Sequence, residues 1–257
     1  MEQKDNIREK TGAYVWERIT VEPDEERFDR AAAGRIAEQI LLKPDSVIGL
    51  STGRTTGNMH RLLAAAWQRE RFDVSHVTFF GLDEVVGVPR EYSGACYTML
   101  RTELVEALGV PDDRFLMLPT ESDDFPAACC QFTESLAIRG GIDLLMLGLG
   151  ENGHLGFNQP GTPFESQAWV TEMNVELEER IRRETQTPRD KWLGGVTLGL
   201  RDIMHARRIV LVAKGRNKCE AVRRMLRGPV TTDVPASILQ LHPCCEFLLD
   251  SLAASAL

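Results

Sequence analysis

The sequence has 257 residues, of which 43% are hydrophobic and 26% are charged, and its formal net charge is −8. This composition is ordinary for a globular protein with a substantial core; no basic block indicates nucleic acid as a partner, and no apolar run is long enough to span a membrane. The polar N-terminus is unlike a secretory signal, and the six cysteines follow neither a zinc-site nor a disulfide pattern, so we expect a cytoplasmic protein without a structural metal.

The hydrophobic pattern predicts strands that alternate with helices along the chain. The predicted strands lie at residues 13–16, 46–50, 77–82, 115–119, 142–147, 169–173, 209–213 and 246–249. The predicted helices lie at residues 24–42, 58–69, 93–108, 125–139, 175–184, 201–206, 219–226 and 236–240. A turn is expected at 195–200 and a mobile loop at 185–194. This alternation is typical of a Rossmann-like α/β fold, a mainly parallel sheet with helices on both faces. No linker or repeat interrupts it, so residues 1–257 are expected to form one domain.

A turn rich in glycine, hydroxyl groups and arginine follows the strand at 46–50. The turn consists of Ser51, Thr52, Gly53, Arg54 and Thr55. Backbone N–H groups at the start of a helix favour an anion, and hydroxyl groups add donors, so this turn is a candidate phosphate site. The Gly-Lys-Ser/Thr of a Walker A loop is absent. An ordinary strand-to-helix turn with a Ser/Thr cap is the alternative interpretation.

Two carboxylates, Asp83 and Glu84, follow the predicted strand at 77–82. A carboxylate at the end of a buried strand can act as a base in a cleft, since partial burial brings its pKa toward neutrality. The alternative is that Asp83 only caps a turn. From the residues alone, both interpretations stay open.

The most informative stretch is residues 142–160, where an apolar run ends in glycines and a polar loop. The loop presents Glu151, Asn152, His154, Asn158 and Gln159. Open α/β sheets bind ligands at the carboxyl ends of their strands, so this loop is a candidate active-site edge. Residues 148–153 match Gly-x-Gly-x-x-Gly, but Gly156, Pro160 and Pro163 argue against the helix that a dinucleotide site requires. We therefore reject a dinucleotide site and expect no cofactor.

Several motifs, in family order, resemble the glucosamine-6-phosphate deaminase/isomerase family. They are Leu50-Ser51-Thr52-Gly53, Leu82-Asp83-Glu84, Gly148-Leu149-Gly150 with the run from Asn152 to Asn158, and the run from Leu239 to Pro243. The resemblance covers about residues 20 to 250 and is nearest to the galactosamine-6-phosphate isomerase branch, which also resembles the run from Gly195 to Ile203. It implies an enzyme that isomerises and deaminates galactosamine or glucosamine 6-phosphate, giving a ketohexose 6-phosphate and ammonia. Family members are often hexamers or smaller assemblies, so a homo-oligomer is compatible with the resemblance.

The resemblance implies catalytic roles for Asp83 and His154, and Glu84, Asn152 and Gln159 are further catalytic candidates. Asp83 is expected to move a proton between C1 and C2 of the sugar, with Glu84 beside it. His154 is expected to open the pyranose ring by acting on the ring oxygen. Both roles suit the chemistry of these side chains, because a carboxylate can take a proton from carbon and histidine exchanges protons near neutral pH.

The resemblance also implies how the substrate is anchored. The turn from Ser51 to Thr55, Lys218 and Arg183 are expected to bind the sugar phosphate, a dianion that needs cations and N–H donors. The segment at 169–195 is expected to form a mobile lid over the site. The predicted partner is thus a small sugar phosphate.

Asn152 and Gln159 depart from the pattern of the glucosamine-6-phosphate enzymes, which have Asp and Glu there. The galactosamine branch shares the Asn but keeps the Glu. Glutamine can hold a histidine by a hydrogen bond, but it cannot stabilise an imidazolium by charge. Glu151 either compensates or points to solvent. The hypothesis is slower ring opening, or a substrate that enters as an open chain or as a different aminosugar derivative.

Two other functions are alternatives. The first is a hydrolase of the 6-phosphogluconolactonase kind, whose pattern has an Asp before the second glycine and a Ser-Leu-Phe-Pro run after the histidine. This chain has Asn152 and the run from Gly156 to Pro160 instead. The second is a non-catalytic sugar-phosphate-binding module, which the absence of a preceding helix-turn-helix pattern disfavours. The C4 configuration of the substrate cannot be assigned from these motifs.

Overall fold

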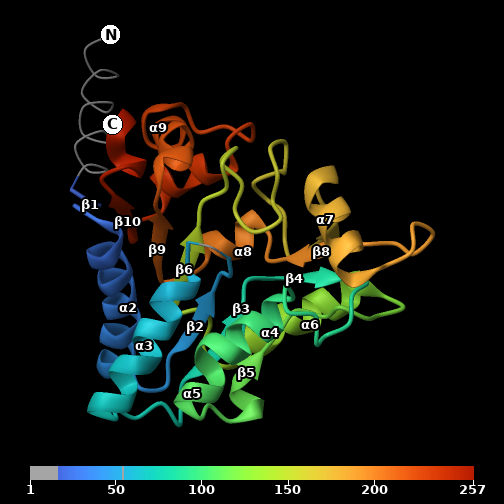
Figure 1. Cartoon of the computed structure of the whole chain (residues 1–257), viewed down its shortest axis with the longest axis horizontal. Coiled ribbons are helices and arrows are strands. Elements are labelled where there is room, and N and C mark those ends of the chain that lie inside the picture. Colours follow the sequence, from blue (N-terminus) through green and yellow to red (C-terminus); the bar gives the residue numbers. More distant parts are fainter. Residues whose placement is uncertain (1–16, 54) are drawn as a thin grey trace.

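A computed structural model of the chain describes residues 17–53 and 55–257 (Figure 1), so the strand expected at 13–16 lies outside the described residues. The strands are β1 (Ile19–Glu22), β2 (Val47–Leu50), β3 (Thr78–Gly81), β4 (Asp83–Val86), β5 (Phe115–Leu116), β6 (Leu144–Gly148), β7 (Trp169–Thr171), β8 (Gly194–Thr197), β9 (Arg208–Ala213) and β10 (Cys245–Asp250). The α-helices are α2 (Glu25–Leu42), α3 (Gly57–Glu70), α4 (Cys96–Leu100), α5 (Glu106–Leu108), α6 (Phe125–Ile138), α7 (Val175–Thr185), α8 (Leu200–Met204) and α9 (Cys219–Arg227). The remaining helical segments are the π-helical η1 (Arg101–Val105) and the 3-10 helices η2 (Asp112–Arg114), η3 (Arg216–Lys218), η4 (Pro235–Leu241) and η5 (Ala253–Ala256).

Seven strands form one sheet in which every neighbouring pair is parallel, in the order β1-β10-β9-β6-β2-β3-β5. A second sheet of three antiparallel strands has the order β4-β8-β7. Figure 1 shows this smaller sheet and α7 together at one side of the larger sheet. The mainly parallel sheet expected from the sequence is therefore confirmed. Among the described helices, none is both long and apolar enough to cross a bilayer.

The parallel strands bury side chains on both of their faces. In β2, Ile48 packs into an apolar core with α2 and α3, whereas its neighbour Val47 packs into a second core with α6, α8 and α9. Leu144 and Leu145 of β6 divide between the same two cores. Successive side chains of a strand point to opposite faces, and burying each aliphatic side chain contributes about 1.5–3 kcal/mol. The prediction of helices on both faces is confirmed.

The strand order reverses direction between β2 and β6, which are neighbours in the sheet. From β2 the chain proceeds outward through β3 to β5, and from β6 it proceeds the other way through β9 to β10. The carboxyl ends of β2 and β6 are joined by a hydrogen bond from the Gly148 N–H to Oγ of Ser51 at 2.9 Å. Ligands of open α/β sheets bind in the crevice at such a switch point. We therefore expect the ligand site to be formed by the loops that follow β2, β3, β6 and β9.

The turn expected at 195–200 is wrong, because Gly194–Thr197 form β8 at the centre of the antiparallel sheet. A Cβ at Gly195 would lie 2.5 Å from Cγ of Phe157, and one at Gly194 would lie 2.2 Å from the ring of Trp192. The two glycines therefore allow aromatic rings to approach the strand closely. In the sequence, a pair of glycines that makes room for rings within a strand looks the same as a pair of glycines in a turn.

Three further elements differ from the expectation. The carboxylate pair begins a strand, β4, instead of following the last strand residue, and β1 is an edge strand that the hydrophobic pattern does not reveal. The helix expected at 93–108 begins at Cys96. Its start is fixed by the Glu84 carboxylate, which accepts hydrogen bonds from the N–H groups of Cys96 and Tyr97 at 2.8 and 2.7 Å. A contact between distant elements thus decides where this helix starts.

Replacing Gly195 by alanine is expected to lower the free energy of unfolding by about 1–3 kcal/mol, because the new methyl group would overlap the Phe157 ring. Gly34, exposed in the middle of α2 with no surrounding atom within 4 Å of a Cβ position, is the matched control. Gly34→Ala is expected to stabilise the protein by about 0.5–1 kcal/mol. Denaturant titrations of both variants measure the difference, and a Gly195→Ala variant as stable as the wild type contradicts the packing argument.

Candidate active site

Asp83 is the first residue of β4 and lies half-buried beside the crevice. Its Oδ1 accepts a hydrogen bond from the Cys96 thiol, with 3.5 Å between oxygen and sulfur. A Cβ at Gly156 would lie 3.3 Å from its Oδ2, so the loop after β6 contacts this carboxylate. The pKa of Asp83 is raised to about 7, mainly by burial and also by the Glu84 carboxylate, while the Cys96 hydrogen bond opposes the rise. A carboxylate with this pKa can take up and return a proton near neutral pH.

The side chain of Glu84 lies in a different environment from that of Asp83. Its carboxylate is buried and accepts hydrogen bonds from the backbone N–H groups of Val85, Cys96 and Tyr97. Burial raises the pKa of Glu84, and these backbone hydrogen bonds oppose the rise. The oxygens are thus occupied by backbone N–H groups, two of them at the start of α4, and the catalytic role expected for Glu84 stays a prediction.

The loop from Gly148 to Asn158, called here the histidine loop, is held at both ends. The Gly150 N–H donates to the carbonyl oxygen of His154 at 2.9 Å, and a Cβ at Gly150 would lie 2.2 Å from Nδ1 of the imidazole. The buried Asn158 amide donates to the carbonyl oxygens of Leu155 and Leu198 at 2.9 and 2.8 Å. The imidazole is therefore presented from a fixed backbone, with glycine leaving the space for its ring.

Asn152 and Gln159 form a hydrogen-bonded chain with the imidazole of His154. Nδ1 of His154 donates to Oδ1 of Asn152 at 2.7 Å, and Nδ2 of Asn152 donates to Oε1 of Gln159 at 3.0 Å. An amide oxygen only accepts, so the ring proton is on Nδ1 and the lone pair is on Nε2. The structure places both amides beside the histidine, in a chain without formal charge.

His154 is neutral in this environment. Burial and, to a smaller extent, the nearby Lys218 ammonium lower the pKa of His154 to about 4, and Glu151 acts in the opposite direction. Glu151 does not touch the ring through a hydrogen bond; its Oε1 accepts from Nδ2 of Asn217 at 2.6 Å. That contact joins the histidine loop to the segment after β9, which carries Lys218. The Lys218 ammonium is therefore near enough to the neutral imidazole to lower its pKa.

Hydroxyl groups hold the turn after β2 to its surroundings. Ser51 accepts the hydrogen bond from Gly148, and Oγ1 of Thr52 donates to Sγ of Cys96 at 3.1 Å. Both hydroxyls, expected to bind phosphate, thus already have partners within the protein. Thr55 is half-buried in the same turn, whereas Arg54 lies outside the described residues.

The start of α3 follows directly from this turn. The Gly53 carbonyl accepts hydrogen bonds from the N–H groups of Thr56 and Gly57 at 3.2 and 3.1 Å, with Gly53 at a φ of +123°. The Thr56 side chain does not cap the helix. The first backbone N–H groups of a helix attract an anion when no side chain caps them, so α3 directs its positive end at the crevice.

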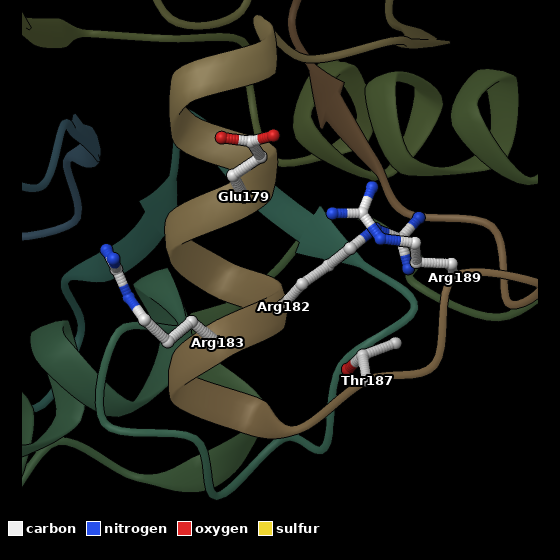
Figure 2. A pocket seen from close by; sticks show the side chains of 5 residues that line it. All are labelled: Glu179, Arg182, Arg183, Thr187 and Arg189. Carbon is white, nitrogen blue, oxygen red and sulfur yellow. The ribbon is translucent and has the colours of Figure 1, made fainter.

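Arg183 lies exposed on α7, next to a pocket of about 370 Å³ lined by Glu179, Arg182, Arg183, Thr187 and Arg189. Figure 2 shows Arg183 extending from the side of α7 opposite to Arg182 and Arg189. Arg182 is held by an ion pair with Glu178 at 2.7 Å. Among the described residues, no hydrogen bond joins Arg183 to Asp83 or His154. The structure thus places the histidine loop against Asp83 and Lys218 near His154, and the phosphate-binding role expected for Arg183 stays a prediction.

The family can be assigned from the sequence as a whole. A family model described as glucosamine-6-phosphate isomerases/6-phosphogluconolactonase matches residues 23–244. A glucosamine-6-phosphate deaminase of Rhodopirellula baltica is 38% identical over 93% of this chain and 95% of its own length. A glucosamine-6-phosphate deaminase of Clostridium botulinum is 34% identical over 93% and 98% of the two chains. This chain belongs to that family.

Solved structures agree with this assignment. A monomeric glucosamine-6-phosphate deaminase superposes with a TM-score of 0.86 at 30% identity, over 93% of this chain and all of the other. A 6-phosphogluconolactonase from Trypanosoma brucei has a TM-score of 0.70 at 23% identity over 93% and 98% of the chains, so it shares the fold. The resemblance to the family is confirmed, whereas nothing in these comparisons distinguishes the galactosamine branch.

Two residues beside Asp83 are missed by sequence reasoning. Cys96 looks like an ordinary core residue of the helix at 93–108, yet its sulfur contacts both Thr52 and Asp83. Thr197 pairs with Asp83 across the antiparallel sheet, and its Oγ1 would lie 2.6 Å from a Cβ at Gly156. Cys96 follows no recognisable motif, and the run from Gly195 to Ile203 does not single out Thr197, so only the packing of β4 against β8 and α4 reveals them. In the described part of the chain, no three His, Cys, Asp or Glu side chains gather as metal ligands.

Proposed function

We propose that this chain is an amino-sugar-phosphate deaminase that converts a hexosamine 6-phosphate into a ketohexose 6-phosphate and ammonia. The observation that carries the proposal is the contact between Asp83, whose pKa is about 7, and the loop of the neutral His154 at the switch point of the sheet. Family membership and the names of the relatives support the same reaction class. Those names favour glucosamine 6-phosphate over galactosamine 6-phosphate as the substrate.

The proposed reaction has three steps. The pyranose ring opens, a proton leaves C2 while another is added at C1, and the C2 amine becomes an imine. Water then adds at C2 and ammonia leaves, so that hexosamine 6-phosphate and water give ketohexose 6-phosphate and ammonia. Asp83 carries the proton between the two carbons, and the lone pair on Nε2 of His154 exchanges a proton with a sugar oxygen during ring opening.

The phosphate is proposed to bind between the start of α3 and Lys218. The uncapped N-terminus of α3 supplies backbone N–H groups, and Lys218 adds a full positive charge. Residues 169–195, which include β7 and α7, are proposed to close over the bound sugar and to carry Arg183 toward the phosphate. In this arrangement the phosphate anchors the substrate so that C1 and C2 face Asp83.

The kcat/KM of the enzyme is expected to fall as the pH drops through about 7, the pKa of Asp83. Asp83 must be ionised to accept a proton from C2, and below this pKa it is protonated. His154 stays neutral across this limb because its pKa is about 4. A pH profile of kcat/KM measures the limb. A profile that stays flat through neutral pH and falls only at the ordinary pKa of an aspartate contradicts the role of Asp83.

Gln159→Glu is expected to raise the pKa of His154 and to speed ring opening at neutral pH, by up to about tenfold for one unit of pKa. The new carboxylate would accept the hydrogen bond of Asn152 and place a negative charge at the end of the chain that reaches His154. NMR titration of His154 and turnover of the closed sugar are the measurements. Gln167→Glu adds the same charge at an exposed position and is the control. If neither the histidine titration nor the rate responds, the missing charge is not what distinguishes this site.

A screen for ammonia release tests the function itself. Glucosamine, galactosamine and related 6-phosphates are supplied in deuterated water, with 6-phosphogluconolactone as the competing substrate. We expect ammonia release from a hexosamine 6-phosphate together with deuterium at C1 of the product. Lactone hydrolysis without deuterium incorporation would assign the chain to hydrolases, and binding of sugar phosphates without any turnover would make it a binding module.

A further inference from the structure

The thiol of Cys96 lies between the turn after β2 and the carboxylate of Asp83. Its sulfur accepts a hydrogen bond from Oγ1 of Thr52 at 3.1 Å and donates to Oδ1 of Asp83 at 3.5 Å. Cys96 is itself buried, with 6% of its surface exposed. The three side chains form one hydrogen-bonded row that crosses from β2 to β4 through the start of α4.

The backbone of α4 places Cys96 beside Asp83. Both oxygens of the buried Glu84 carboxylate accept hydrogen bonds from the first N–H groups of this helix, those of Cys96 and Tyr97. Glu84 directly follows Asp83 in β4, so one strand supplies both the candidate base and the group that places its hydrogen-bond donor. These contacts fix the backbone of Cys96 beside Asp83, so the thiol can leave the carboxylate only by rotating about its Cα–Cβ bond.

The thiol is well suited to be a permanent donor. Burial raises the pKa of Cys96 well above the usual range, and the carboxylates of Asp83 and Glu84 add to the rise. The sulfur therefore keeps its proton while Asp83 changes charge. The titratable groups that act on the Asp83 carboxylate are Cys96 from α4 and Glu84 from β4.

We propose that Cys96 is a positioning residue for the candidate base, Asp83. Its S–H group holds the Asp83 carboxylate in place by a hydrogen bond and favours the ionised form of that carboxylate. The proposal rests on the role given to Asp83 in the proposed function. A thiol is a weak donor, so its effect is smaller than that of a hydroxyl or an N–H group. Asp83 must take up a proton and release it again in each turnover. A weak donor suits this role, because a strong donor would stabilise the charged carboxylate so far that it would no longer accept the proton.

Three substitutions separate the hydrogen bond from the packing. Cys96→Val fills the space without a donor, Cys96→Ala removes both donor and volume, and Cys96→Ser restores a donor. We expect the acid limb of the kcat/KM profile to move upward by roughly half a unit to one unit in the valine and alanine variants, which is a loss of about three- to tenfold below the limb. The serine variant is expected to return the limb to the wild-type position or below it.

Cys129→Ala is the matched control, since Cys129 is another buried thiol and lies on α6. It is expected to leave the limb unchanged even if it lowers stability. The proposal is overturned if the limb of Cys96→Val coincides with that of the wild type, or if Cys129→Ala moves the limb equally. Loss of activity in Asp83→Asn, tested separately, establishes the base; an active Asp83→Asn variant would remove the proposed function instead.

An infrared measurement tests the contact without turnover. The S–H stretching band of Cys96 is identified by its disappearance in Cys96→Ala. We expect this band to shift as Asp83 ionises near neutral pH and to lose this shift in Asp83→Asn, because the band reports the strength of the acceptor. A band that does not respond to pH in the wild-type protein overturns the proposal whether or not the chain turns over a hexosamine 6-phosphate.

Discussion

Asp83→Asn is expected to lower kcat by roughly 10²–10⁴-fold, the range that a general base contributes. The amide has nearly the same shape as the carboxylate and can still accept the hydrogen bond of Cys96 through its oxygen. It has no basic oxygen at neutral pH, however, so the proton on C2 has no acceptor. Substrate affinity should change little, because the proposed phosphate contacts come from other elements.

Two readouts separate this effect from general damage. Ammonia release reports the whole reaction, and deuterium entering C1 from the solvent reports the proton transfer alone. Both are expected to fall together in Asp83→Asn. Asp123→Asn, at an exposed position before α6, is the control and should retain wild-type rates. An Asp83→Asn variant that still exchanges deuterium at the wild-type rate would show that another group moves the proton.

Much of the fold follows from local sequence signals. Buried runs such as Val47–Leu50 have the length and apolar character of parallel strands, and the helices between them show their own spacing and caps, as with Asp24 before α2. The antiparallel sheet is less visible because its central strand contains Gly194 and Gly195. Gly195 leaves room for the ring of Phe157, which comes from the histidine loop, and Gly194 leaves room for the nearby Trp192. The packing of Phe157 is long-range and leaves no local signature.

In the candidate site too, some residues can be predicted from local sequence signals and others cannot. Asp83 and His154 can be predicted because each follows a buried strand, and the carboxyl ends of parallel strands meet at one edge of the sheet. The sequence cannot tell Asp83 from Glu84, since the pairing of β4 decides which carboxylate faces the crevice and which one starts α4. It cannot reveal Cys96 either, because a thiol in a core and a thiol beside a base have the same local pattern.

His154→Gln is expected to lower kcat/KM for the closed sugar by roughly 10²-fold or more, because the proton exchanger of ring opening is lost. Glutamine can still donate to Oδ1 of Asn152, so the amide chain and the loop should be preserved. His76→Gln, at an exposed position outside the site, is the control. If His154→Gln keeps the wild-type rate with the closed sugar, the substrate enters already open, as the replacement of both acids by Asn152 and Gln159 would allow.

The charge state of His154 provides a second test of the same role. Lys218 contributes to the low pKa of His154, about 4 in the free site. A phosphate dianion bound at Lys218 would offset that positive charge, so substrate binding should raise the pKa of His154 and make the imidazole a better proton acceptor. NMR titration with inorganic phosphate, and with a reduced hexitol 6-phosphate that cannot react, is expected to show this upward shift. Lys218→Met should raise the pKa in the free protein and abolish the further shift on binding. If the pKa of His154 is the same in all of these states, Lys218 and the bound phosphate do not act on His154, and this prediction is wrong.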